Sequence, residues 1–508
     1  MKVLLFCPNI GKNAIEKNFL APTFGLERLA AHIRKKTRVE VNICDLNIDE
    51  FPKDVAEYDI IGFSIYHYTF ENDLSLIHKC RKISPNSLLL AGGVEATFNY
   101  AQIFENSPVD IIILGEGETP LLELINLKNG YTNLKEYKDI KKIKGLVVRG
   151  NDGITLTNYS TPLNQTEFEE ATLSIDFNKI DIRKYWDANA SHYKNPNYLE
   201  INAVRIFTGN YCPYKCAFCS STNFLNFSSG GKKVELVYLP HDGVIKLIKN
   251  ALDARPGTKT IIFDDDNFML NKRRVIELCN RILENKNNNK LPKDLSFICQ
   301  GRIDAISSIY DSKILKLMRK AGFRMFLCGV ESFSQHVLDN LNKKIKVNMI
   351  WKAVDAMLEA GIKPHLYVIL FTPWTTLEEL KMSLKYIVNY IKKGCDFGVN
   401  EYIQLLPGSD LTINKQNYKI RYKNIKNKEF GINFQKEELL LPNDPEIMKI
   451  ADNLDSDIED FRKDVISKYG IKHFPDRTEI LLMVYVLADI LDERETKDRI
   501  KDMFEESL

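Results

Sequence analysis

Strands and helices alternate along the first part of the chain, as its pattern of apolar and polar residues predicts. Short apolar runs typical of buried strands are separated by segments whose apolar residues recur at helical spacing. The predicted strands include KVLLFCP (2–8), DIIGFSIY (59–66) and VDIIILGEGE (109–118). Because these runs are apolar throughout, both faces of each strand are expected to be buried, as in a doubly wound parallel sheet. We assign residues 1–140 to this Rossmann-like domain.

The predicted strands of this domain end in small or polar residues. Ser64, Gly92 and Gly93, and the GEG run at 115–117 follow three of them. A sheet of this type binds ligands at its carboxyl edge, where glycine lets the backbone approach a bulky group. Glycines in ordinary turns would give the same sequence. The residues alone therefore fit both a ligand-binding edge and a set of turns. A dinucleotide fingerprint is excluded, because no G-x-G-x-x-G follows the first strand.

A second alternation of strands and helices begins near residue 196, with longer repeats. Six predicted strands, from AVRIFTGN (203–210) to FGVNEYIQLLP (397–407), are separated by amphipathic helices such as DSKILKLMRKAGF (311–323). Six such units predict a partial (β/α)6 barrel, which we assign to residues 196–412. Barrels of this type place their chemistry at the carboxyl ends of the strands.

Two other stretches have weaker patterns. Residues 141–195 contain a predicted hairpin around Asn151 and then polar and aromatic sequence, which suggests a linker between the domains. Residues 413–508 are rich in lysine at first and then predicted to be helical, so we expect a C-terminal helical domain over the barrel mouth. The chain as a whole is predicted to belong to the α/β class.

Composition and charge narrow the class of protein. Of the 508 residues, 44% are hydrophobic and 27% are charged, which is typical of a globular chain. The 70 basic and 68 acidic residues nearly cancel, so we expect no nucleic acid partner. The first residues predict a buried strand instead of a signal peptide, and no run approaches the roughly 18 apolar residues that a membrane span needs. We expect a cytoplasmic protein without a membrane span.

Three of the ten cysteines stand close together in GNYCPYKCAFCSS (209–221). Cys212, Cys216 and Cys219 have the spacing C-x3-C-x2-C and follow the first predicted barrel strand. Three thiols in one such loop can bind three irons of a [4Fe-4S] cluster and leave the fourth iron without a protein ligand. Structural zinc is the alternative, although no histidine stands at finger spacing. The other seven cysteines stand singly and are predicted to be small core residues.

The sequence resembles the radical S-adenosylmethionine (SAM) enzymes, whose defining loop has this spacing with an aromatic residue before the third cysteine. The resemblance implies that the open iron holds SAM, and that one electron from the cluster cleaves SAM to methionine and a 5′-deoxyadenosyl radical. FDDDNF (263–268), GRIDAI (301–306) and GVES (329–332) resemble later segments of the family. They imply that SAM contacts these side chains: Phe218, Asp265, Asp266, Arg302 and Glu331.

These barrel residues also have purely structural interpretations. The acidic run could be a solvated strand end, and Arg302 could pair with Asp304 on the surface. The segment FTPWTTLEEL (371–380) departs from the family, because Thr372 and Trp374 stand where relatives commonly carry glycines.

The first domain resembles the cobalamin-binding domain that precedes the barrel in one branch of the same family. The matching segments are PTFGLERLAAHIRKK (22–36), LLLAGGVEA (88–96) and ILGEGETPLLEL (113–124). In that branch, cobalamin lies face-on against the carboxyl edge of the sheet. The resemblance implies that cobalamin contacts these residues: Gly11, Ser64, Tyr66, Gly92, Gly93, Gly115, Glu116 and Gly117.

The usual cobalt ligand is missing from the loop after the first strand. Domains of the methionine-synthase type carry a histidine three residues before a glycine, whereas this chain has Pro8 before Gly11. The resemblance therefore implies a cobalt without a histidine from this loop. His67, in SIYHYTF, is the one alternative ligand close to the edge, but a histidine between two tyrosines is more often packed or hydrogen-bonded.

The two domains together imply a cobalamin-dependent radical SAM enzyme. We expect it to methylate an unactivated carbon of a small molecule, lipid or peptide, with electrons supplied by a reductase such as flavodoxin or ferredoxin. Cyclisation, ring contraction or rearrangement without methyl transfer is the alternative, and no residue separates the two. A third alternative is a non-catalytic module that binds a corrin.

Overall fold

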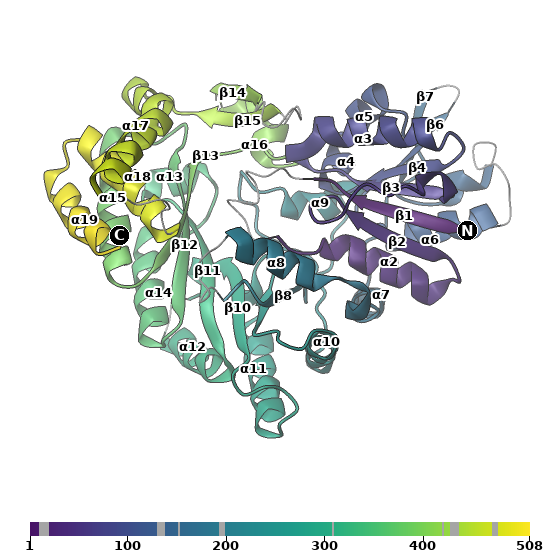
Figure 1. Ribbon diagram of the computed structural model, residues 1–508, viewed down its shortest axis with the longest axis horizontal. Helices are drawn as coiled ribbons and strands as arrows, with labels where there is room; N and C mark the ends of the chain where they lie inside the picture. The colour runs from purple at the N-terminus through teal and green to yellow at the C-terminus, as the bar shows by residue number, and fades with distance from the viewer. Residues whose placement is uncertain are drawn as a thin grey trace.

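Two parallel sheets organise the chain, and a mostly helical region follows the second sheet (Figure 1). The first sheet, coloured purple to blue, lies beside the second, coloured teal to green. This arrangement confirms the predicted α/β class. The computed structural model describes these residues: 1–9, 20–129, 138–150, 153–192, 199–306, 309–418, 421–426, 436–469 and 476–507.

The first sheet has the strand order β2-β1-β3-β4-β5-β6-β7 within the described residues. Strands β1 to β5 run parallel, and the chain changes direction across the sheet between β1 and β3. In open sheets of this kind, ligands bind beyond the carboxyl ends of the strands at that change of direction. The parallel strands have these bounds: β1 Lys2–Cys7, β2 Glu40–Asp45, β3 Ile60–Ser64, β4 Leu88–Gly92 and β5 Ile111–Ile113.

Successive residues of β1 alternate between two hydrophobic cores, one on each face of the first sheet. Leu4 and Phe6 belong to one core, and Val3 and Leu5 to the other. Burial on both faces explains why the strands of this sheet are continuously apolar. The first core is covered by α3 (Phe70–Ile83), α4 (Val94–Phe98) and α5 (Tyr100–Asn106), and the second by α2 (Phe24–Lys36) and α6 (Glu118–Asn129).

Much of the stretch that was expected to be a linker is packed into the domains. Its hairpin, β6 (Leu146–Gly150) and β7 (Gly153–Leu156), pairs antiparallel with β5 and so extends the first sheet beyond residue 140. Helix α7 (Gln165–Leu173) then contributes Phe168 to the core of the second domain. Helix α8 spans Ile182–His192. The predicted linker over 141–195 therefore contains the expected hairpin and also helices.

The second sheet is the predicted partial barrel. Its six described strands are parallel and stand in chain order from β8 to β13, so β8 and β13 are its edges. The strands are β8 Ala203–Ile206, β9 Thr260–Phe263, β10 Ser296–Arg302, β11 Phe323–Glu331, β12 Lys363–Phe371 and β13 Asp396–Tyr402. The connecting helices include α10 His241–Ala254, α11 Lys272–Asn287, α12 Ile309–Ala321, α13 Gln335–Asn340, α14 Val347–Glu359 and α15 Leu377–Lys392.

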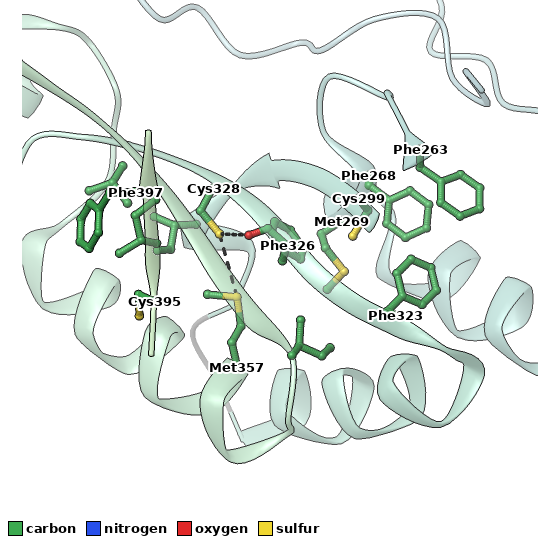
Figure 2. Close-up of a cluster of buried hydrophobic side chains, with 14 of the residues drawn as sticks. Phe263, Phe268, Met269, Cys299, Phe323, Phe326, Cys328, Met357, Cys395 and Phe397 are labelled. Carbon is green, nitrogen blue, oxygen red and sulfur yellow. Dashed lines mark hydrogen bonds between the residues drawn. The ribbon is translucent and has the colours of Figure 1, made fainter. Parts of the chain in front are cut away.

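Aromatic and sulfur-containing side chains fill the core between the second sheet and its helices (Figure 2). The rings of Phe263 and Phe268 lie 4.8 Å apart, and Cys328 Sγ lies 3.9 Å from Met357 Sδ. The cysteines outside the motif were predicted to be core residues, and all of them are buried: Cys7, Cys44, Cys80, Cys279, Cys299, Cys328 and Cys395.

The C-terminal region begins with a strand pair that the sequence did not predict. After α16 (Asp410–Ile413) it forms an antiparallel pair, β14 (Arg421–Lys426) and β15 (Lys436–Leu441). Helices α17 to α19 follow, and α18 and α19 pack against α15, along the side of the barrel (Figure 1). Their bounds are α17 Pro445–Tyr469, α18 Asp476–Ile490 and α19 Arg494–Ser507. No helix within the described residues is long and apolar enough to cross a membrane.

Candidate functional site

The three motif cysteines lie in the loop between β8 and α9 (Ser221–Ser228), at the carboxyl end of the second sheet. Cys212, Cys216 and Cys219 are all partly exposed, unlike the seven core cysteines. Because parallel strands share one carboxyl edge, the residues that follow β9, β10 and β11 lie at the same end of the barrel. The structure thus brings the motif to the edge where barrels carry out chemistry.

Asp265, directly after β9, anchors the start of the cysteine loop. Its carboxylate accepts hydrogen bonds from the Thr208 hydroxyl and from the backbone N–H of Gly209, the latter at 2.9 Å. Arg274 Nη1 lies 3.8 Å from the same carboxylate. The neighbouring Asp266 accepts a hydrogen bond from the Ser221 hydroxyl at the end of the loop. Asp264 and Asp265 are therefore buried, and Asp265 supports the loop from within, whereas Asp266 is exposed.

The middle of the loop is held from the opposite side. The Ala217 N–H donates to the Leu341 carbonyl, and the Leu411 N–H donates to the Ala217 carbonyl, both at 2.9 Å. The Asn342 amide donates to the Lys215 carbonyl at 2.6 Å. Ala217 also belongs to a small apolar core that Phe218 joins from its edge. These contacts fix the loop before any cofactor binds.

Arg302, at the end of β10, reaches the cysteine loop. Its Nη1 donates to Cys216 Sγ at 3.2 Å, and its guanidinium lies 3.9 Å from the ring centre of Tyr214. The predicted pairing with Asp304 is present at 3.0 Å, but Arg302 is only 4% exposed, so the pair is not a surface one. A buried cation therefore stands beside one of the three motif sulfurs.

Glu331, at the end of β11, is paired with Lys343, a residue that the sequence did not single out. Lys343 Nζ lies 2.6 Å from Glu331 Oε1 and 5.5 Å from the ring centre of Phe218. Burial has the largest effect and lowers the pKa of Lys343, but Glu331 and Cys216 together raise it above its ordinary value. Lys343 stands in the charged run NKKIK (342–346). The sequence of this run does not indicate which of its lysines is buried.

The thiols of the loop must lose their protons before they can bind a metal. Burial raises the pKa of Cys219 to about 11 and also raises the pKa of Cys212, so binding of iron must displace their protons. In the part of the chain that the structure describes, no three His, Cys, Asp or Glu side chains converge to hold one metal ion. In a [4Fe-4S] cluster, three of the four irons can each take one thiolate of this loop, and the fourth iron stays without a protein ligand.

Four residues predicted to contact cobalamin lie at the carboxyl edge of the first sheet. Ser64 and Gly92 are paired neighbours at the ends of β3 and β4. Gly93 has φ +97°, and a Cβ there would lie 3.4 Å from Ser64 Oγ, so the turn is both tight and left-handed. Gly115 has φ +74°, and a Cβ there would overlap Ser228 of α9. Gly11 lies outside the described residues.

The other three residues predicted to contact cobalamin make contacts within the protein. The Glu116 carboxylate lies 3.3 Å from Arg28 Nη2 and accepts the Leu163 N–H at 2.8 Å. The Tyr66 hydroxyl lies 3.4 Å from Thr23 Oγ1. A Cβ on Gly117 would be in ordinary contact with Leu29. All three positions therefore have neighbours within the protein, and the Tyr66 side chain also bonds with Ser64.

Residues beyond the carboxyl ends of both sheets meet at the junction of the domains. The Tyr68 hydroxyl donates to Gln404 Oε1 at 2.9 Å. The Asn223 amide donates to the Gly408 carbonyl at 2.6 Å, and a Cβ on Gly408 would overlap the Phe98 ring. The loops that follow β3 and β4 therefore lie against α9 and the loop after β13.

Two family models match the chain. A model described as the radical SAM superfamily matches residues 206–387, and a model described as the B12 binding domain matches residues 13–125. The radical SAM domain implies a [4Fe-4S] cluster and SAM as cofactors, and the B12-binding domain implies cobalamin.

Curated relatives resemble most of the chain at low identity. An uncharacterized methyltransferase of Pyrococcus horikoshii is 26% identical over 394 residues, which cover 76% of this chain and 77% of the relative. An anaerobic magnesium-protoporphyrin IX monomethyl ester cyclase of Cereibacter sphaeroides is 27% identical over 317 residues. That match covers 62% of this chain but only 45% of the cyclase, so this chain spans less than half of the cyclase.

A solved structure shares the fold over nearly the whole chain. It is the cobalamin-dependent S-adenosylmethionine radical enzyme OxsB, solved with aqua-cobalamin and S-adenosylmethionine bound. The TM-score is 0.70, and the match covers 98% of this chain and 75% of OxsB at 16% identity. At this identity the likeness establishes the arrangement of the two domains and not the reaction.

Proposed function

Because this chain is a radical SAM enzyme that also carries a B12-binding domain, we propose that it methylates an unactivated carbon atom of its substrate. When bound, the [4Fe-4S] cluster supplies the electron that cleaves SAM, and cobalamin supplies a carrier for the methyl group. The protein's own contribution is to hold both cofactors and the substrate in place and to exclude water and oxygen. The substrate class that we propose is a small molecule, lipid or peptide.

The contact between Gly115 and Ser228 carries this proposal. Gly115 follows β5 at the cobalamin edge of the first sheet, and Ser228 ends the helix that begins two residues after Cys219. A Cβ on Gly115 would overlap Ser228, so the two elements touch without space for a further side chain. An enzyme that passes a methyl group between centres in separate domains needs this closeness of the two edges.

We assign the cofactors to the following side chains. Cys212, Cys216 and Cys219 would bind the cluster, and Arg302 would balance negative charge beside Cys216. The Glu331–Lys343 pair offers a carboxylate and an ammonium group at the same end of the barrel, which suits the amino acid and ribose parts of SAM. Gly93 and Ser64 would line the path of the cobalamin tail.

The methyltransferase from Pyrococcus horikoshii supports methyl transfer, since the match covers 76% of this chain. The cyclase from Cereibacter sphaeroides supports a second candidate, which is ring formation without methyl transfer. Both candidates use the same cluster loop, so the two reactions are separated by their products.

Isotope labelling separates the two candidates. We would reconstitute the protein anaerobically with iron, sulfide and cobalamin, reduce it, and add SAM with a deuterated methyl group and a small-molecule extract of anaerobic cells. Methyl transfer predicts S-adenosylhomocysteine and a product that carries the deuterated methyl group. A product that lacks two hydrogens and carries no label overturns methyl transfer in favour of cyclisation.

A variant control ties either product to the cluster. Cys216→Ala removes one iron ligand and should abolish 5′-deoxyadenosine and the product together. Cys279→Ala alters a buried cysteine of α11 outside the loop and should leave both in place. Persistence of product in Cys216→Ala overturns the assignment of the chemistry to this loop.

A further inference from the structure

One ring nitrogen of His67 has no hydrogen-bond partner among the described residues. His67 begins a short 3₁₀ turn, His67–Thr69, just beyond β3 and next to the place where the first sheet changes direction. Its Nδ1 lies 3.1 Å from Glu95 Oε2. Its Nε2 is buried and unpartnered, while the side chain as a whole keeps 17% exposure. The imidazole therefore lies at the boundary of the domain with one nitrogen satisfied and one free.

The backbone that carries His67 is fixed by Asp73. The Asp73 carboxylate accepts the Tyr66 N–H at 3.1 Å and the Thr69 hydroxyl at 2.9 Å. Asp73 is 1% exposed, so these bonds are shielded from water. The residues on both sides of His67 are thus held from one buried group, which restricts where the ring can lie.

Glu95 fixes the ring itself. It belongs to α4, which begins directly after Gly92 and Gly93, and it is 3% exposed. Its second oxygen accepts the Asn99 amide at 2.5 Å, so the carboxylate has one oxygen for Asn99 and one for His67. A buried carboxylate opposite Nδ1 favours the tautomer with the proton on Nδ1 and the lone pair on Nε2.

This pattern is the usual environment of a metal-binding histidine. Such histidines donate one ring N–H to a carboxylate, which orients the ring and makes the other nitrogen a better ligand. His32 and His241 also have one buried ring nitrogen without a hydrogen-bond partner among the described residues, but for His67 the other nitrogen faces the buried Glu95 carboxylate. Tyr68, the next residue, donates to Gln404 of the barrel domain. The turn that carries His67 therefore lies on the side of the first domain that faces the barrel.

We propose that His67 Nε2 is an axial ligand of the cobalt of bound cobalamin. It would replace the histidine that related cobalamin domains carry where this chain has Pro8. Glu95 then acts as a positioning residue that orients the imidazole. The inference uses the cobalamin of the proposed function and does not depend on methyl transfer.

Electron paramagnetic resonance of the cobalt(II) form tests the ligand directly. One ¹⁴N axial ligand splits each cobalt line into three, and ¹⁵N splits it into two. We would load the full-length protein with cobalamin, keep its cluster in the oxidised diamagnetic state, and compare protein grown with ordinary and with ¹⁵N histidine. Three lines that become two identify a histidine nitrogen. Three lines that persist after ¹⁵N-histidine labelling identify the base of cobalamin itself as the ligand. Lines without nitrogen splitting identify water or an empty axial position. Either result overturns the proposal.

Variants assign the histidine. His67→Phe should lose the histidine splitting while the visible spectrum still reports bound cobalamin, and added imidazole should restore a three-line pattern in His67→Gly. His78→Phe changes a histidine of α3 whose Nε2 lies 3.1 Å from the Asn106 carbonyl, and it should keep the wild-type spectrum. If His67→Phe keeps the ¹⁵N-histidine doublet, another histidine is the ligand and the proposal fails.

The outcomes separate this inference from the proposed function. Bound cobalamin without histidine splitting, together with transfer of the labelled methyl group, overturns the inference alone. A histidine ligand together with an unlabelled, dehydrogenated product overturns methyl transfer alone. If His67→Phe does not fold, the comparison of ¹⁴N and ¹⁵N histidine in the wild-type protein still decides the question.

Discussion

Lys343 is the residue at the cluster loop whose removal should cost the most stability. It pairs with Glu331 at 2.6 Å, and both side chains are about nine-tenths buried. Lys343→Met would leave the Glu331 carboxylate unpaired, which should lower the free energy of unfolding by about 3–5 kcal/mol. SAM binding, measured by equilibrium dialysis with the reconstituted protein, should also weaken.

Two further variants separate the charge from the packing. Lys344→Met changes an exposed neighbour and should alter neither quantity. The double variant Lys343→Met with Glu331→Gln should recover much of the stability, because no buried charge remains, but not the affinity for SAM. Equal losses in Lys343→Met and Lys344→Met, measured by urea unfolding, would contradict the buried pair.

Glu27 on α2 should make stability depend on pH. Burial raises its pKa from the ordinary 4.5 to about 7, and Arg34 only partly opposes this. The folded state therefore binds a proton that the unfolded state releases, so stability is lost as pH rises from about 4.5 through 7. Glu27→Gln should be more stable than the wild type by roughly 3 kcal/mol at pH 8 and nearly equal to it at pH 4.5.

Urea unfolding at several pH values measures this difference. Glu123→Gln, at an exposed position of α6, is the control and should change stability little at any pH. A gain for Glu27→Gln that does not grow with pH would show that its carboxyl is not the titrating group.

The sequence revealed the cluster ligands because three cysteines within eight positions form a local pattern. It did not reveal Lys343, because partnership with Glu331 depends on burial that no spacing encodes. It also placed Asp265 against SAM, whereas the structure shows its carboxylate bonded to Thr208 and Gly209. Family motifs thus locate a residue near the site without saying which neighbour its side chain contacts.

At the scale of elements, the end of β9 supports the cysteine loop through Asp265. Asp265→Asn would remove a buried charge that accepts from Thr208 and Gly209 and faces Arg274. We expect less iron and sulfide per protein after anaerobic reconstitution, together with a loss of about 3 kcal/mol of stability. The control variant Asp253→Asn, at an exposed position of α10, should bind as much iron and sulfide as the wild-type protein. Full iron content in Asp265→Asn would mean that the loop is held by its other contacts.

The elements that were predicted correctly are those with a strong period or a continuous apolar run. Strands β1, β3 and β9 have such runs, because nearly all of their residues are buried. The hairpin β6–β7 was located from its Gly153 turn but assigned to a linker, since antiparallel pairing with β5 is a tertiary contact. The pair β14–β15 was missed because its charged sequence does not resemble a buried strand.

At the scale of the whole molecule, one close contact between the domains depends on a glycine. Gly408, in the loop after β13, has φ +75°, and a Cβ there would overlap the Phe98 ring of the first domain. Phe98 also lies 5.1 Å from Phe227 of α9, so one ring touches two elements of the barrel domain. The distance between the two cofactor edges therefore depends on a position where only glycine fits.

Gly408→Ala should open this junction. The alanine adds a strained left-handed backbone, at about 1–2 kcal/mol, and a clash with Phe98, at about 1–3 kcal/mol. Gly394→Ala is the matched control, because Gly394 has φ +98° but no neighbouring atom within 4 Å, so only the backbone strain applies. The two variants should differ in their free energy of unfolding, measured with urea, and this difference should shrink in a Phe98→Leu background. Limited proteolysis should cut Gly408→Ala between the domains faster than it cuts Gly394→Ala. Equal effects of the two alanines would show that Phe98 does not press on Gly408, and the Tyr68–Gln404 hydrogen bond would then be the contact to test at the junction.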